Sequence, residues 1–199
     1  YPEFVEFHTA KAGKTGNNSL PGTESSVETP EETLHKAYQS IRSDLAGEIL
    51  EKVKSNSPQF FEKLVVDLMV AMGYGASRSS ARQSKAHTGD EGVDGIIKED
   101  RLGLDVIYLQ AKKWEGTVGR PEIQKFVGAL HGKRAKKGVF LTTGKFSDDA
   151  IKYVETIDPK VILIDGHRLA DLMIDFGLGT AVISNLEIKR MDSDYFIEE

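Results

Sequence analysis

The strongest constraint on the fold is the order of apolar patterns after Ser57, because strand-like runs alternate there with helix-like segments. The expected helices follow the 3.6-residue period and cover residues 58–73, 121–131, 147–156 and 166–175. The expected strands are short β-rich runs and cover residues 93–97, 104–112, 138–143 and 161–164. This order predicts an α/β domain of roughly 120 residues, in which helices flank a mixed central sheet.

The segment before this domain differs from it in composition. Residues 11–30 are rich in Gly, Ser, Thr, Asn and Pro, which is typical of a linker. Residues 1–10 contain two Phe and one Val, and we expect them to be the last strand of a domain that is mostly missing from this chain. Thr29 and Pro30 combine an N-cap hydroxyl with a proline at the first helical position, so a helix is predicted to run from there to about Lys54.

These boundaries predict four parts of the chain. They are a domain remnant with its linker, a connecting helix, the α/β domain and a weakly patterned acidic tail, over residues 1–30, 31–56, 57–179 and 180–199.

Composition excludes several kinds of chemistry. The chain has no Cys, which rules out a disulfide framework, a thiolate zinc site, an iron–sulfur site and a cysteine nucleophile, and which agrees with a reducing compartment. Its apolar runs are shorter than a membrane span, and its first residues lack the pattern of a signal peptide. We therefore expect a cytoplasmic protein without a membrane partner.

The net charge of −5 conceals an uneven distribution of charge along the chain. Residues 76–138 contain thirteen Lys and Arg against eight Asp and Glu, and the remaining residues are strongly acidic. A basic segment within an acidic chain favours an anionic partner such as nucleic acid at one face. The alternative is that these Lys and Arg side chains only solvate the surface, and composition does not separate the two interpretations.

The stretch from Gly89 to Lys112 contains the residues with the most specific chemistry. Asp94 lies at the start of the first strand of the expected hairpin, and Gln110 and Lys112 lie two residues apart on the second strand, with side chains on the same face. A turn near Asp100 would bring Asp94 close to both. A carboxylate and an amide oxygen suit Mg²⁺, and a neighbouring lysine can orient a water molecule or offset charge on a phosphate.

Glu62 is the expected second carboxylate, because it borders the apolar stripe of its helix and could reach the sheet edge. Each of these residues also has a structural interpretation. Glu62 could be a first-turn glutamate that favours the helix dipole, and Asp94 could be a turn residue near glycines. Gln110 and Lys112 could lie on an exposed edge strand, although their segment resembles a central strand, where an unpaired lysine is costly.

Five sequence blocks together resemble the catalytic domain of the Mrr-type restriction endonucleases, within the PD-(D/E)xK nuclease superfamily. The blocks are Phe60–Val65, Gly89–Gly95, Gln110–Lys112, Gly138–Thr143 and Ile164–Gly166. The resemblance covers about residues 57–179. The helix from Thr29 is similar to the segment that joins a winged-helix DNA-reading domain to the nuclease in that family, and residues 1–10 would be the end of that reader.

The resemblance implies a restriction-endonuclease-like fold and a Mg²⁺-dependent endonuclease that hydrolyses DNA phosphodiester bonds. It also implies a restriction system directed at modified DNA, of type IV. Asp94 would be the main metal ligand and Lys112 the catalytic lysine. Gln110 stands where the wider superfamily has Glu or Asp, which removes one negative charge and makes Glu62 more important as a ligand. Asp90 and Glu91 precede the motif and are not assigned as ligands.

Two alternatives stay open at this point: a junction-resolving or repair-type nuclease, and a nuclease-like fold that only binds DNA. The expected partner is double-stranded DNA. The restriction-enzyme hypothesis further implies that this DNA is methylated. Cutting both strands with one active site per chain favours a homodimer or higher homo-oligomer. The basic residues expected to contact the DNA backbone are Arg78, Arg82, Lys85, Lys112, Lys113, Arg120, Lys133, Arg134, Lys136 and Lys137.

Overall fold

A computed structural model of the chain describes residues 28–75, 93–100 and 102–197. Contacts divide the chain into two units, residues 1–37 and 38–199, and the described part of the first unit is mainly the start of helix α1 (Pro30–Ser55). Among the described residues, none of the helices combines the length and apolar character needed to cross a membrane.

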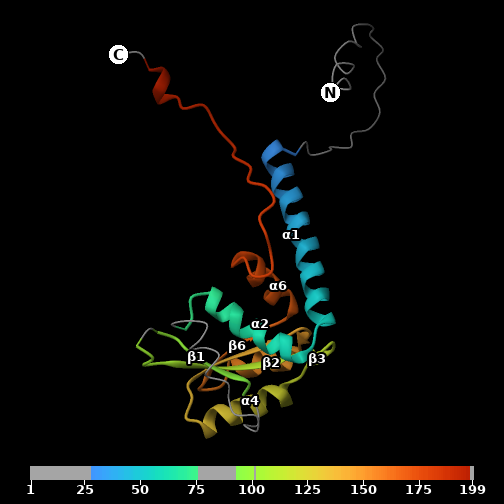
Figure 1. Cartoon of the computed structure of the whole chain (residues 1–199), viewed down its shortest axis with the longest axis vertical. Helices are drawn as coiled ribbons and strands as arrows, with labels where there is room; N and C mark the ends of the chain where they lie inside the picture. Colours follow the sequence, from blue (N-terminus) through green and yellow to red (C-terminus); the bar gives the residue numbers. More distant parts are fainter. Residues whose placement is uncertain (1–27, 76–92, 101, 198–199) are drawn as a thin grey trace. The chain divides into compact units, whose positions relative to one another are not determined.

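A four-stranded mixed sheet lies at the centre of the second unit (Figure 1). Its strands, in spatial order, are β1 (Gly95–Lys98), β2 (Val106–Lys112), β4 (Lys137–Thr142) and β6 (Lys160–Ile164). Strand β1 is antiparallel to β2, whereas β2, β4 and β6 are parallel. The predicted mixed sheet is therefore confirmed. A second, small parallel sheet of β3 (Thr117–Val118) and β5 (Lys145–Phe146) was not expected from the sequence.

The helices lie close to the predicted ranges, and side-chain caps start four of them. They are α1 (Pro30–Ser55), α2 (Pro58–Ala71), α4 (Arg120–Gly132), α5 (Asp148–Val154) and α6 (Gly166–Asp175), followed by the 3₁₀ turn η2 (Asp194–Phe196). The capping side chains of Ser57, Ser147 and Asp165 accept hydrogen bonds from backbone N–H groups in the first turns of α2, α5 and α6. The predicted cap of α1 is confirmed, because Thr29 Oγ1 accepts a hydrogen bond from the backbone N–H of Glu32 at 3.2 Å.

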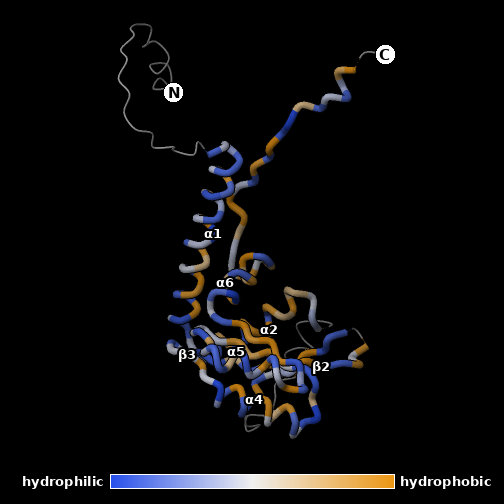
Figure 2. Tube along the Cα trace, turned by 180° about the vertical axis from the view of Figure 1, so that it is seen from behind, coloured by the Kyte–Doolittle hydropathy of each residue, from blue (hydrophilic) through white to orange (hydrophobic). Residues whose placement is uncertain are grey.

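Helices cover both faces of the sheet because strand residues point alternately to the two sides. On β4, Val139 and Leu141 face a core formed with α2, α6 and the C-terminal half of α1, whereas Phe140 faces a second core formed with α4 and α5. Helix α2 is hydrophobic along most of its length, as expected for a helix packed on a sheet (Figure 2). The sheet is thus buried on both sides, and polar groups within it need partners.

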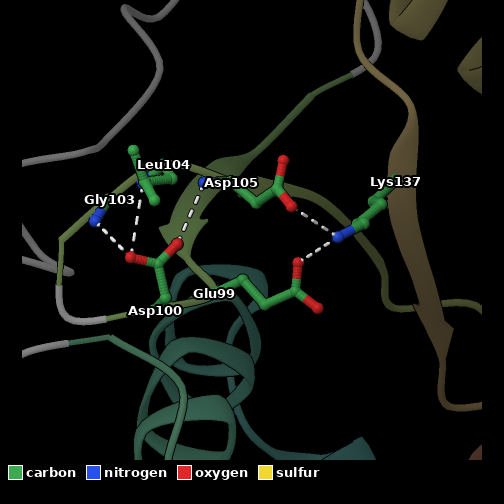
Figure 3. A network of polar contacts seen from close by, with 6 residues as sticks. All are labelled: Glu99, Asp100, Gly103, Leu104, Asp105 and Lys137. Carbon is green, nitrogen blue, oxygen red and sulfur yellow. Dashed lines mark hydrogen bonds and ion pairs between the residues drawn. The ribbon is translucent and has the colours of Figure 1, made fainter.

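The turn between β1 and β2 is fixed by Asp100, whose side chain replaces backbone acceptors (Figure 3). Asp100 Oδ1 accepts hydrogen bonds from the backbone N–H groups of Leu102, Gly103 and Leu104, and Oδ2 accepts one from Asp105 at 3.0 Å. Gly103 has a φ of 73°, a left-handed conformation that favours glycine. This turn sets the register in which Gly95 pairs with Leu109.

An ion-pair cluster ties the base of the same turn to the neighbouring strand (Figure 3). Lys137, the first residue of β4, donates hydrogen bonds to Glu99 and, at 3.0 Å, to Asp105. The two carboxylates raise the pKa of Lys137, with Glu99 as the larger cause. The cluster lies at the start of β4, whereas Lys112 pairs with Thr142 at the other end of that strand.

The close packing of α4 on β4 leaves no space for a side chain at Gly138. A Cβ atom there would lie 2.8 Å from the Phe126 ring and 2.9 Å from Leu130. We predict that Gly138→Ala lowers the free energy of unfolding by about 1–3 kcal/mol, measured by urea denaturation, because two core side chains must shift.

Gly128 is the matched control, because it lies on an exposed part of α4 where an added Cβ meets no atom within 4 Å among the described residues. Gly128→Ala should raise the free energy of unfolding by up to about 1 kcal/mol through helix propensity. Equal effects of the two substitutions would contradict this account of the α4–β4 interface.

Candidate active site

The hairpin of β1 and β2 places Asp94 directly beside Gln110. Asp94 precedes β1, and its backbone N–H donates to Leu109 at 2.8 Å, which extends the pairing by one residue. Its Oδ2 atom accepts a hydrogen bond from Gln110 Nε2 at 2.5 Å and another from the backbone N–H of Ala111 at 2.7 Å. The carboxylate is therefore held at the end of the sheet by two donors on β2.

Lys112 follows on the same face of β2, but its nearest partners are residues that sequence analysis did not assign to the site. Its ammonium group pairs with the carboxylate of Glu122, in the first turn of α4. The same Nζ atom lies 4.3 Å from the centroid of the Trp114 ring, a cation–π geometry. The sequence signal for Glu122 was an acidic residue in the first turn of α4. That pattern is ordinarily explained by the helix dipole and did not indicate a site residue.

Electrostatics link Asp94 to both Glu62 and Lys112. Burial is the largest cause that raises the pKa of Asp94 above its ordinary value, and the negative charge of Glu62 raises it further. The hydrogen bond from Ala111 and the positive charge of Lys112 act in the opposite direction. An ionised Asp94 is thus in an environment that favours a nearby positive charge.

Glu62 is exposed and is the fifth residue of α2. Within the described residues of that helix, the first turn contains no acidic side chain, so the first-turn alternative for Glu62 does not apply. Pro58, one helical turn earlier on the same side, lines the pocket described below. The N-terminal part of α2 therefore lies near the end of β2.

The donor atoms at this point fit a hard cation. Within the part of the chain that the structure describes, Gln110 Oε1 is buried and has no hydrogen-bond partner. A buried carbonyl oxygen without a partner is costly, and a cation would satisfy it. Among the described residues there is no group of three or more His, Cys, Asp and Glu side chains that could hold a metal ion. The candidate donors are therefore fewer charged groups: the carboxylates of Asp94 and Glu62, with the Gln110 amide oxygen. Mg²⁺ commonly uses one or two carboxylates and keeps several waters.

An open pocket of about 330 Å³ lies beside these residues, between the end of β2 and α4. Phe126 and Phe140 contribute apolar surface, and three lysines and one glutamate contribute the charges: Lys112, Lys113, Lys125 and Glu122. The excess of positive charge suits an anionic ligand.

The basic residues expected at the DNA backbone do not form one surface. Lys113 lines the pocket. Arg120 is the first residue of α4, and its Cζ atom lies 4.8 Å from the centroid of the Tyr153 ring. Lys133, Arg134, Lys136 and Lys137 instead follow α4 and lead into β4, at the opposite end of the sheet from Lys112. Arg78, Arg82, Lys85, His87, Asp90 and Glu91 lie outside the described residues.

Solved structures that match this chain include two restriction endonucleases. The DNA modification-dependent restriction endonuclease AspBHI matches with a TM-score of 0.52 at 19% identity, over 68% of this chain and 36% of that chain. The MspJI restriction endonuclease, in complex with a 27-mer oligonucleotide, matches with a TM-score of 0.41 at 24% identity, over 82% of this chain and 34% of that chain. The likeness to AspBHI supports the fold alone.

The sequence itself matches more specifically. Residues 53–173 match the Mrr catalytic domain, a restriction endonuclease family. The type IV methyl-directed restriction enzyme EcoKMrr of Escherichia coli (strain K12) is 42% identical over 168 residues, which are 84% of this chain and 54% of that enzyme. This chain thus spans about half the length of that relative. The match covers most of the α/β domain, and the chain belongs to the Mrr-type restriction endonuclease family.

Proposed function

We propose that this chain is a magnesium-dependent endonuclease that hydrolyses phosphodiester bonds in double-stranded DNA. The observation that carries the proposal is the position of Asp94 against Gln110 at the end of β2, with Lys112 on the same face. Membership of the Mrr-type family supports the same activity. The chain spans 54% of the E. coli relative, so the activity is inferred from the site rather than transferred from that enzyme.

Asp94, Glu62 and Gln110 are the residues that would hold the magnesium ion. When bound, Mg²⁺ supplies Lewis-acid polarisation of a phosphate oxygen and lowers the pKa of a bound water. Because Gln110 is neutral, Asp94 and Glu62 contribute the negative charge of the proposed site. The raised pKa of Asp94 agrees with this role, since a cation would offset both its burial and its repulsion by Glu62.

Lys112 is the residue that we propose to act on the phosphate. Its ammonium group is held on the same face as Gln110 and lines the open pocket, where a phosphate can approach. There it would orient an attacking water and offset the negative charge that develops on the phosphate in the transition state. Lys113, in the same pocket, would contact the DNA backbone.

We infer that the target is modified DNA, because the E. coli relative is methyl-directed. We also propose a homodimer or higher homo-oligomer, since two strands must be cut and each chain contains one proposed site. A cleavage assay on matched methylated and unmethylated plasmids tests the first inference. Equal cleavage of both plasmids by this chain would mean that residues 1–199 do not recognise DNA methylation.

Substitution of the proposed metal ligand and lysine should abolish cleavage without unfolding the domain. We predict that Asp94→Ala and Lys112→Ala each reduce Mg²⁺-dependent nicking of supercoiled plasmid by about 100-fold or more, because each removes a group that acts on the metal or the phosphate. Circular dichroism checks the fold, and Arg134→Ala, at the opposite end of the sheet, is the control.

Glu62→Gln separates metal binding from chemistry in the same assay. It should raise the Mg²⁺ concentration needed for half-maximal nicking, and saturating Mg²⁺ should restore the rate. Full nicking by a folded Asp94→Ala variant would rule out the proposed site, and equal losses at low and saturating Mg²⁺ would remove Glu62 from the ligands.

The raised pKa of Asp94 predicts a pH-dependent cost in protein freed of divalent cations with EDTA. Because the folded-state pKa exceeds the unfolded value of about 3.9, the folded state binds more protons between the two values, and stability falls as pH rises through that window. Asp94→Asn should therefore unfold at a higher urea concentration than the wild type at about pH 7, with a smaller difference at about pH 4.

Added Mg²⁺ should then stabilise the wild-type protein and leave Asp94→Asn unchanged. The control is Asp158→Asn, in an exposed loop. A destabilised Asp94→Asn variant at pH 7 would contradict the proposed electrostatic cost.

The two ends of the sheet should differ in their contribution to DNA binding. Replacing both Lys113 and Arg120 by Ala should make the plot of log affinity against log salt concentration less steep, by about 0.9 for each DNA phosphate that is no longer neutralised. The double variant Arg134→Ala with Lys136→Ala, at the other end, should leave the slope unchanged. Fluorescence anisotropy measures the affinity. The reverse result would indicate that the DNA binds near the start of β4.

A further inference from the structure

The ammonium group of Lys112 is held on two sides by side chains that the proposed mechanism does not use. Glu122 reaches it from α4, and Trp114 reaches it from the loop after β2. We call Glu122, Lys112 and Trp114 the lysine clamp. Helix α4 positions Glu122, and hydrogen bonds to the end of β4 hold the backbone of Trp114.

Glu122 uses both carboxylate oxygens within the clamp region. Oε2 pairs with Lys112, and Oε1 accepts a hydrogen bond from Lys125 at 2.9 Å. The side chains of Glu122 and Lys112 are 21% and 32% exposed, whereas that of Lys125 is 73% exposed. The pair with Lys112 is thus less screened by solvent than the pair with Lys125. Lys112, followed by Lys125, lowers the pKa of Glu122, so the carboxylate stays ionised at neutral pH.

Trp114 is anchored to the end of β4 through Thr143. The backbone N–H of Trp114 donates to Thr143 Oγ1 at 3.0 Å, and the same hydroxyl donates to the backbone carbonyl of Trp114 at 2.9 Å. Thr143 is only 2% exposed, so these bonds are shielded from water. These bonds fix the backbone of Trp114, and its indole ring, on a residue that is 41% exposed, lies against the ammonium group of Lys112.

A lysine side chain loses rotamer freedom when it is confined to one geometry, because its flexible four-carbon stem has several rotatable bonds. The lysine clamp restricts this freedom before any ligand binds, through a charge-assisted hydrogen bond on one side and a cation–π contact on the other. Such preorganisation lowers the cost of bringing a reacting group into position.

We propose that Glu122 is a positioning residue that holds the ammonium group of Lys112 against Trp114, ready for the DNA phosphate. This inference rests on the proposed function, because it assigns a role within the same site. Glu122 acts through Lys112 and does not touch the reacting atoms. Its effect should therefore fall on the rate of the chemical step, and not on the affinity for Mg²⁺ or DNA.

The single Trp of the chain gives a readout that does not require cleavage. Because an ammonium group lies 4.3 Å from the ring centroid, the emission of Trp114 reports whether Lys112 stays in the clamp. Glu122→Gln removes the charge and keeps the shape. Its emission spectrum should shift toward that of Lys112→Met, which lacks the ammonium group, and Glu122→Asp should lie closer to the wild type. Gln124→Ala, an exposed neighbour on α4, is the matched control.

Cleavage kinetics complete the test. Glu122→Gln should lower kcat by about 10-fold or more, with KM for DNA and the half-saturating Mg²⁺ concentration unchanged, and Glu122→Asp should recover part of the rate. Unchanged emission in a folded Glu122→Gln variant would overturn the proposal. So would a raised half-saturating Mg²⁺ concentration at unchanged kcat, which would make Glu122 a metal ligand. If Lys112→Met cleaves at the wild-type rate, the proposed function fails, while the emission spectra still decide the clamp.

Discussion

Asp100 accepts four backbone hydrogen bonds across the turn between β1 and β2, and the arrangement of the proposed catalytic side chains depends on the register that these bonds help to set. A slip of one residue would turn Asp94 to the opposite face from Gln110 and Lys112. Lys137 strengthens the same register by tying both sides of the turn to β4. The structural cluster at one end of the sheet thus stabilises the geometry of the proposed site at the other end.

Packing on the two faces of the sheet brings the remaining groups to that end. Helix α2 packs on one face and carries Glu62 near the end of β2, whereas α4 packs on the other face and carries Glu122 to Lys112. The contact of Phe126 with Phe140, at a ring-centroid distance of 5.6 Å, fixes α4 one turn after Glu122. Core packing and preorganisation of the lysine are therefore coupled in this domain.

The parts of the site that depend on local pattern could be predicted from the sequence. Strand alternation and the turn near Asp100 were sufficient to expect Asp94 beside Gln110, and the order of strands and helices was sufficient to expect the mixed sheet. Glu122 could not be predicted in this way, because it reaches Lys112 only through the docking of α4 on the sheet, which local sequence patterns do not specify. Nor could composition separate Lys113 from Lys137, since residues of one basic segment lie at opposite ends of parallel strands.

We propose that Glu62, Asp94 and Gln110 hold a divalent cation beside Lys112. The most direct measurement is anomalous scattering from crystals of the protein grown with Mn²⁺, which substitutes for Mg²⁺ at oxygen-rich sites. We expect a peak within bonding distance of the Asp94 carboxylate and the Gln110 side-chain oxygen, and its loss in Asp94→Asn crystals. A peak that avoids Asp94, or one that persists in the variant, would contradict it.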